Sequence, residues 1–218
     1  MTETTDTRPG SPDAQYWEDF YREREQVWSG RPNQLLVREV AALTPGTALD
    51  LGCGEGADAI WLAQQGWRVT AVDISATALE RAAVRAAGLG VGERIDWQRH
   101  DLPDSFPTGT FDLVSAQFFH SPVALAGERE QALRAAARVV APDGILLVAG
   151  HEGWPSWMQT PPAHHVHLPS TAEVLDALGL EPGRWRVELE DVIARDFPGP
   201  EGQPGTRTDN LLRVRRTG

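Results

Sequence analysis

The stretch Leu49-Asp50-Leu51-Gly52-Cys53-Gly54-Glu55-Gly56-Ala57 decides the fold, because it joins a short apolar run to a helical segment through closely spaced glycines. We predict a buried strand at 47–51 and a helix at 56–65. Glycines at such a junction let the chain turn tightly and let a ligand approach the backbone. The helix N-terminus behind the turn offers free N–H groups. The stretch therefore predicts a ligand-binding turn between a strand and a helix.

An acidic residue ends the strand that is predicted after this turn. Asp73 ends the next predicted strand, 68–73, and lies 21 residues after Gly52. A carboxylate there can accept hydrogen bonds from both ribose hydroxyls of a nucleoside lying across the strand ends. Gly52, Gly54 and Ala57 also satisfy the dinucleotide pattern G-x-G-x-x-[GA]. The turn and the acid alone therefore leave two cofactors open, a nicotinamide dinucleotide and S-adenosylmethionine (SAM).

Strands and helices alternate on both sides of this turn. The remaining strands of the alternation are predicted at 94–99, 111–116 and 144–149, with helices at 33–43, 76–88 and 123–141. Such βαβ units form a parallel sheet with right-handed crossovers. After a short helix at 170–178, two last runs, 185–195 and 207–216, are expected to pair antiparallel at the sheet edge. The predicted fold is a Rossmann-like α/β domain.

We predict a single domain at 14–218. Residues 1–13 are polar with Pro9, Gly10 and Pro12, so we expect a flexible tail. Residues 14–45 carry an amphipathic aromatic helix and a second helix, and residues 151–169 form a loop with two Trp and four His. Exposing these aromatics together is costly on a monomer. We hypothesise that 14–45 and 151–169 close over the sheet as an apolar lid; a cover for the core or a dimer contact is the alternative.

Composition narrows the class of protein. The net charge is −11, all 20 basic residues are Arg, and there is one Cys. These values argue against nucleic-acid binding, lysine-based catalysis, Walker-type phosphate loops and thiolate zinc sites. No apolar run is long enough to span a membrane, and the N-terminus does not look like a signal peptide, so a cytoplasmic location is expected. A small-molecule partner is favoured, with a monomer or a homodimer as the assembly.

The chain strongly resembles the class I SAM-dependent methyltransferases from about residue 14 to 216. Residues 49–56 are similar to that family's first motif, and Val72-Asp73-Ile74-Ser75 to its second. His100-Asp101-Leu102 and Gln117 follow the third and fourth predicted strands, where the family binds its cofactor. Residues 28–33, Trp-Ser-Gly-Arg-Pro-Asn, are similar to the small thiopurine- and tellurite-type enzymes. The resemblance implies a seven-stranded sheet with helices on both faces and an antiparallel last strand.

The resemblance implies cofactor-binding roles for individual residues of this chain. Gly52 and Gly54 would let the backbone approach the methionine part of SAM, with Asp50 orienting it. Asp73, followed by Ile74, would bind the ribose. Asp101 and Leu102 would hold the adenine, and Gln117 would contact the methionine amine and the incoming nucleophile. The predicted cofactor-binding residues are thus Asp50, Gly52, Gly54, Asp73, Ile74, Asp101, Leu102 and Gln117.

The residues that would bind the methyl acceptor follow no clear sequence motif. His120 and His151 each follow a predicted strand, so each is a candidate general base at the ligand-facing rim, with a rim histidine bonded to backbone as the alternative. Trp28, Arg31, Trp154 and Trp157 are the candidate substrate-binding residues. His164-His165-x-His167 lacks matched carboxylates, so no metal site is expected.

These features favour a methyltransferase acting on the S, N or O atom of a small metabolite or natural product. Two alternatives stay open at this point, an NAD-type oxidoreductase and a SAM-binding regulator without turnover.

Overall fold

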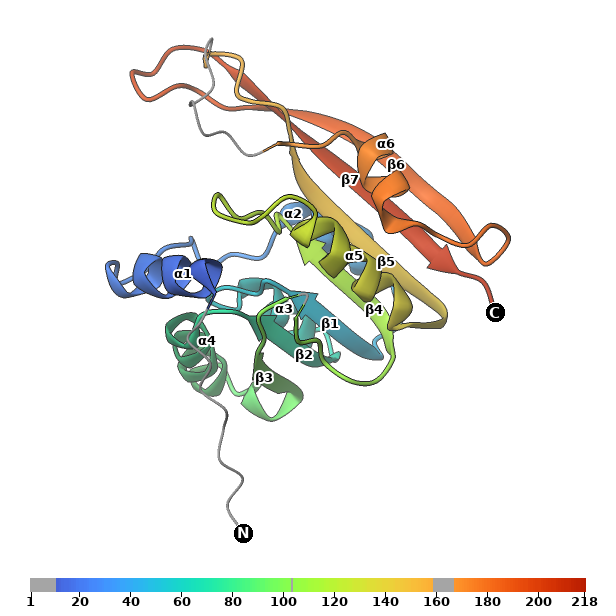
Figure 1. Cartoon of the computed structure of the whole chain (residues 1–218). Coiled ribbons are helices and arrows are strands. Elements are labelled where there is room, and N and C mark those ends of the chain that lie inside the picture. The colour runs from blue at the N-terminus through green and yellow to red at the C-terminus, as the bar shows by residue number, and fades with distance from the viewer. Residues whose placement is uncertain (1–10, 103, 159–166) are drawn as a thin grey trace.

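The computed structural model describes residues 11–102, 104–158 and 167–218. A seven-stranded sheet in the order β3-β2-β1-β4-β5-β7-β6 forms its centre (Figure 1). All neighbouring strands are parallel up to β5, and β7 is antiparallel to both β5 and β6. The strands are β1 (Thr47–Leu51), β2 (Arg68–Asp73), β3 (Ile95–Arg99), β4 (Phe111–Gln117), β5 (Val140–Glu152), β6 (Trp185–Asp196) and β7 (Thr206–Arg216).

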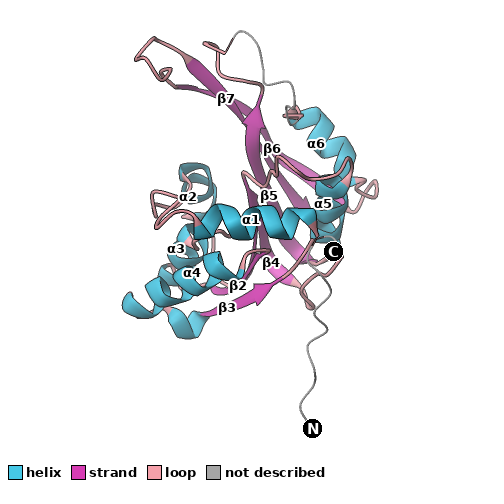
Figure 2. Cartoon of the chain, turned by 60° about the vertical axis from the view of Figure 1, so that its left-hand side comes forward, coloured by secondary structure: helices cyan, strands magenta, loops and turns pink. Residues whose placement is uncertain are grey.

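Helices cover both faces of this sheet, as the turned view in Figure 2 shows. The helices are α1 (Pro12–Arg22), α2 (Gln34–Val40), α3 (Ala57–Gln64), α4 (Ala76–Gly88), α5 (Glu128–Arg138) and α6 (Thr171–Leu178), with a 3₁₀ turn at Gly92–Arg94. One core cluster joins α2, α3 and α4 to the sheet, and a second joins α5 and α6 to the opposite face. The predicted Rossmann-like fold with an antiparallel last strand is confirmed.

The strands are buried because their side chains are apolar on both faces, as expected for parallel strands between helices. In β1, Ala48 belongs to the first core cluster, whereas Leu49 and Leu51 belong to the second. The carboxyl ends of β1, β2, β4 and β5 meet at one edge of the sheet, which is where ligands bind in open α/β folds.

Three predicted boundaries are corrected. Helix α1 begins at Pro12 because Ser11 caps it, its side chain accepting from Ala14 N at 3.1 Å, so the tail does not extend to residue 13. Helix α5 begins at Glu128, since Gly127 adopts φ 88° before it, and not at 123. Strand β5 continues to Glu152, so His151 lies in a strand and not in the predicted loop 151–169. Residues 1–10 of the tail and 159–166 of that loop lie outside the described residues.

The outer hairpin of β6 and β7 projects beyond the body of the domain (Figure 1). Its register sets His151 of β5 opposite Asp209 of β7. Of the helices in the described part of the chain, none has the length and apolar character that a bilayer span requires.

Candidate active site

A cavity of about 820 Å³ opens at the carboxyl edge of the sheet. Its walls come from α1 and the segment after it, the glycine turn, the segment after β4, and the facing parts of β5, β6 and β7. A volume in this range is typical of pockets that bind cofactors and small molecules. The cavity therefore joins the glycine turn to the antiparallel strands of the sheet.

The glycine turn is shaped for close approach of a ligand. Gly52 and Gly54 have φ of 65° and 54°, in the left-handed region that other residues avoid. A Cβ on Gly52 would lie 2.7 Å from Cδ2 of Phe119, and one on Gly54 would lie 2.9 Å from the hydroxyl of Tyr21. Both positions require glycine, because other residues avoid this left-handed backbone conformation and the neighbouring atoms leave no space for a side chain.

Asp73 holds the turn in place. Its Oδ2 accepts a hydrogen bond from Gly54 N at 2.8 Å, and its Oδ1 accepts one from Ser75 N at 2.9 Å. Burial raises the pKa of this carboxyl, and those two hydrogen bonds oppose the rise. Each carboxylate oxygen can accept a further hydrogen bond, so Asp73 keeps capacity for a ligand that donates.

Two more carboxylates crowd this end of the cavity. Burial raises the pKa of Asp50 well above its ordinary value, and the nearby Asp58 and Asp73 add to the rise. Asp58 accepts from the backbone N and the side-chain amide of Asn33, both at 2.7 Å. Asp50 Oδ2 and Gln117 Oε1 are buried acceptors without a donor in the described part of the chain. This end of the cavity is therefore suited to a ligand with N–H and O–H donors or positive charge.

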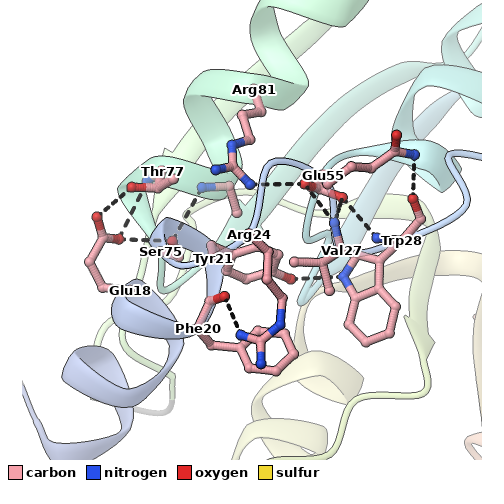
Figure 3. Close-up of polar contacts among 12 residues, drawn as sticks. Glu18, Phe20, Tyr21, Arg24, Val27, Trp28, Glu55, Ser75, Thr77 and Arg81 are labelled. Carbon is pink, nitrogen blue, oxygen red and sulfur yellow. Dashed lines mark hydrogen bonds and ion pairs between the residues drawn. The ribbon is translucent and has the colours of Figure 1, made fainter.

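Helix α1 lines the cavity with Asp13, Trp17 and Tyr21, and polar contacts fasten it to α4 (Figure 3). The carboxylate of Glu18 accepts from Ser75 Oγ at 2.8 Å and from Thr77 Oγ1 at 2.7 Å, and it pairs with Arg22 at 3.0 Å. An acidic side chain at a helix N-terminus is stabilised by the helix dipole and the free N–H groups. Glu18 therefore ties α1 to the first turn of α4, next to Asp73.

The segment after α1 is fastened by Glu55 of the glycine turn (Figure 3). Glu55 Oε2 accepts from Val27 N at 3.1 Å and from Trp28 N at 3.0 Å, and Oε1 pairs with Arg81 at 3.2 Å. The indole N–H of Trp28 donates to the Tyr21 hydroxyl at 3.0 Å. The N-terminal segment is thus held directly above the glycines.

A second constellation lies at the antiparallel end of the cavity. The Nδ1 of His151 hydrogen-bonds Asp209 Oδ1 at 2.7 Å, and Arg195 Nε donates to Asp209 Oδ2 at 2.6 Å. Asp209 is buried, and its hydrogen bonds to His151 and Arg195 outweigh that burial, so its pKa is lowered. An ionised carboxylate on Nδ1 fixes the imidazole tautomer with Nε2 as the proton acceptor. His151 and Asp209 therefore form an oriented acid–base pair.

His120 has a different environment. Its Nε2 accepts a hydrogen bond from His151 N at 3.3 Å, and its Nδ1 has no partner in the described residues. Burial, then the charges of Arg129, His151 and Arg207, lower its pKa to about 3. A neutral imidazole whose acceptor nitrogen is already bonded is suited to donate and not to take a proton. The base role predicted for His120 finds no support in this geometry, whereas His151 has the orientation a base needs.

The cavity brings most of the predicted site residues together. Trp28 and Arg31 line it with both histidines, and so do all the predicted cofactor residues except Asp101. The described lining does not include Asp101, Trp154 or Trp157. Trp157 packs instead on the outer hairpin, where its indole N–H donates to Phe197 O at 3.1 Å. The substrate role predicted for Trp157 finds no support in this geometry, because its ring lies against Phe197, directly after β6.

Sequence reasoning missed the partners of His151. Asp209 and Arg195 lie on the two strands that were predicted only as an edge pair, and Arg129 lies on α5. The available signal was an acid shortly before the apolar run Leu211-Leu212 in the last strand, but the strand register that brings it to His151 is not visible in the sequence. Within the described residues no group of three or more metal-ligating side chains is found, and His164 and His165 lie outside them.

Comparison with known proteins finds methyltransferases that are similar to part of this chain. Residues 48–144 match a family model described as a methyltransferase domain. A ubiquinone biosynthesis O-methyltransferase of Caulobacter sp. (strain K31) is 38% identical over 103 residues, which is 46% of this chain and 39% of that protein. The chain thus spans less than two thirds of the length of such curated relatives.

Solved structures share the fold over nearly the whole chain. A structure from work on the conversion of a disulfide bond into a thioacetal group during echinomycin biosynthesis aligns with a TM-score of 0.72 and 22% identity, covering 94% of this chain and 92% of that one. TehB from Haemophilus influenzae aligns with a TM-score of 0.69 and 14% identity, covering 92% and 67%. These likenesses extend the fold match to the N-terminal helices and the outer hairpin.

Proposed function

We propose, from the premise that this chain carries a class I SAM-dependent methyltransferase domain, that it methylates a small-molecule acceptor with His151 as general base. One observation carries the proposal: a single cavity is lined both by the glycine turn with Asp73 and by the Asp209–His151 pair. The first is what a nucleoside-type cofactor needs, and the second is what an acceptor with a removable proton needs.

The residues of the glycine end fit SAM. The unpartnered acceptors Asp50 Oδ2 and Gln117 Oε1 match a ligand with an ammonium group, and the free lone pairs of Asp73 match ribose hydroxyls. The clustered carboxylates favour the positive charge of a sulfonium. When bound, SAM supplies a methyl group on a sulfonium sulfur, which keeps the electron pair of the S–CH₃ bond as that bond breaks.

The chain's own residues then have three tasks. The turn at Gly52 and Gly54 and the carboxylate of Asp73 hold the cofactor in one orientation. Helix α1, with Trp17 and Tyr21 in the cavity wall, excludes water from the acceptor. His151 Nε2 takes the proton from the acceptor as its nucleophilic atom bonds to the methyl carbon, while Asp209 stabilises the imidazolium so formed. Orientation of the two reactants is expected to contribute about 7–11 kcal/mol to such a step.

The names of several relatives support a small-molecule acceptor, whereas two others are named for ribosomal RNA and a release factor. The Caulobacter relative acts in ubiquinone biosynthesis as an O-methyltransferase, and other relatives are described as a thiocyanate and a probable thiol methyltransferase of Arabidopsis thaliana. The net charge of −11 opposes a nucleic-acid substrate. We extend the small-molecule class, and no particular acceptor, to this chain.

The proposal is tested by turnover with SAM across thiols, phenols, N-heterocycles and halides, with methylated product as the readout. Thermal shift with SAM, its demethylated product S-adenosylhomocysteine (SAH) and NADH accompanies it. A ligand at about 100 times its Kd adds about 2.7 kcal/mol, so SAM and SAH should raise the melting midpoint by about 5 °C. A shift with NADH alone would favour an oxidoreductase, and SAM binding without any product would favour a regulator.

The ribose assignment has its own variant. Asp73→Asn removes the charge while keeping the shape and one acceptor oxygen for the backbone. Since hydrogen bonds to a charged group contribute about 1.5–3 kcal/mol, SAH affinity should fall about 10- to 100-fold by calorimetry. Asp96→Asn, on exposed strand surface, is the matched control. An unchanged Kd in Asp73→Asn would reject the assignment.

A further inference from the structure

Hydrogen-bond donors outnumber acceptors at the antiparallel end of the cavity. His120 Nδ1 and Arg129 Nη2 are buried and have no acceptor among the described residues. Arg195 uses its Nε on Asp209, and no further partner is found for its two terminal nitrogens in the described part of the chain. Buried polar groups are normally satisfied, so donors left over at a cavity wall indicate a ligand that accepts hydrogen bonds.

The protein's own acceptors are already engaged there. Each oxygen of Asp209 already accepts a hydrogen bond, one from His151 and one from Arg195. Arg129 donates its Nε to Phe119 O at 2.9 Å, which is a neutral acceptor. Glu128 also lines the cavity, but its carboxylate accepts from Leu125 N at 2.6 Å.

Positive charge accumulates at the same place. Arg129 and Arg207 both act electrostatically on His120, and Arg195 acts on Arg207. In the described residues neither Arg129 nor Arg207 has a carboxylate within ion-pair distance; Glu130 acts on Arg129 only over a longer distance. Three guanidinium groups thus share the single close carboxylate of Asp209. Guanidinium groups bind carboxylates and other oxyanions strongly, through paired N–H donors.

Several apolar side chains line the cavity near these groups. Phe118 and Phe119 follow β4, Leu35 comes from α2, and Ile193 comes from β6. The ring centroids of Phe118 and His151 lie 4.7 Å apart. An acceptor that fits has an apolar body and one charged group.

We propose that the acceptor is a small organic anion, whose carboxylate or similar oxyanion is bound by the guanidinium groups of Arg129 and Arg195 beside His151. This inference rests on the proposed function, since it names the substrate class of the same site. Arg207, which lies opposite Arg195 in the β6–β7 pair, adds positive potential. His120, kept neutral, is a donor toward the same group.

The test measures binding and needs no turnover. Aromatic and aliphatic carboxylates, each paired with its methyl ester, are titrated into the native protein by calorimetry, with and without SAH. The best carboxylates should bind about tenfold or more tightly than their esters, as expected for a charge-assisted pair. Inorganic sulfate and phosphate form a separate arm, and they should bind more weakly than the best carboxylate because they lack the apolar body.

Variants assign the preference to residues. Arg195→Gln and Arg129→Gln should each bring acid and ester to within about threefold of one another, while Arg195→Lys, which keeps the charge, should retain part of the preference. Arg184→Gln, at an exposed ion pair with Glu181, is the matched control and should behave as the native protein does. SAH affinity reports in each variant that the domain is folded.

Three outcomes would overturn the inference: esters that bind as well as their acids, a preference that survives both Gln variants, or inorganic anions that bind while no carboxylate is preferred. Failure of the proposed function looks different, because the native protein would then either not bind SAH or bind SAM without forming methylated product. The titrations without SAH still decide the anion preference in that case.

Discussion

The two ends of the cavity carry opposite chemistry. At the glycine end, buried carboxylates cluster, and burial with like charge raises the pKa of Asp50. At the antiparallel end, the guanidinium groups of Arg129, Arg195 and Arg207 cluster, and burial with like charge lowers the pKa of His120 to about 3 and that of Arg207 below its ordinary value. Each end is short of the charge that the other has in excess. The difference indicates two ligands of opposite charge, with the reacting atoms between them.

The sharpest way to break this comparison is to remove the base and leave the glycine end intact. His151→Asn should lower kcat/KM about 10²- to 10⁴-fold for phenol-type acceptors, because general-base catalysis contributes in that range. The loss should shrink as the acceptor becomes more acidic, since an acceptor already ionised needs no base. The measurement is kcat/KM across acceptors of graded acidity, with SAH affinity as the reference.

Asp209→Asn tests whether Asp209 acts by orienting His151 or only by stabilising the fold. A residue that only orients His151 should give the same dependence on acceptor acidity with a smaller loss, and SAH affinity should stay within about twofold. His167→Asn, an exposed histidine, is the control. A loss that is equal for thiols and phenols would mean that His151 is not the base.

A second experiment examines the charge at the antiparallel end through stability. His120 is protonated near pH 6.5 in the unfolded chain but only near pH 3 in the folded protein. The unfolded state therefore binds one more proton between these values, so stability is complete above pH 6.5 and falls by about 1.4 kcal/mol per pH unit as the pH is lowered.

His120→Asn should remove that slope. Between pH 7 and pH 5 the native protein should lose about 2 kcal/mol more of its unfolding free energy than His120→Asn does. The measurement is urea unfolding at several pH values in this range. His167→Asn should keep the native slope. If His120→Asn also keeps it, the imidazole is not held neutral in the folded protein.

The smallest effect concerns the cover that both ends share. Tyr21 of α1 lies over Gly54, whereas Trp17 of the same helix donates to Ser121 at 3.1 Å, next to His120. Glu18→Gln weakens the tie to Ser75 and Thr77 by about 1 kcal/mol. SAH and the anionic probe should then each lose about fivefold in affinity.

Exposed Glu23→Gln is the control for this helix. Loss at one end only would show that α1 covers that end alone, and no loss at either end would show that Glu18 does not hold the cover. Equal losses would confirm a common cover above two different sites.

The glycine end could be predicted from the sequence because each of its residues follows an apolar strand. The glycine turn, Asp73 and Gln117 each stand at the end of a strand that the apolar pattern reveals, so the sheet edge brings them together. The chain places all of them in the cavity wall. Family resemblance then named the cofactor that spacing alone left open.

The antiparallel end could be predicted from the sequence only in part. His151 was singled out from its place after a strand, but Asp209 and Arg195 come from strands whose register depends on tertiary pairing. The aromatic residues misled the assignment: Trp157 looked like a pocket residue and instead stacks on Phe197 at 6.3 Å between ring centroids. Apolar patterning predicts that such a side chain is covered, and it does not say by what.

The register of β5 against β7 has a consequence for engineering and for divergence within such a family. Because side chains alternate along a strand, one residue deleted from β7 before Asp209 would turn that carboxylate to the other face and leave the glycine turn untouched. The hairpin 185–216 thus supplies both Asp209 and Arg195, while its residues Leu211 and Leu212 belong to the core. Exchanging it between relatives should exchange the acceptors they accept while the cofactor stays the same.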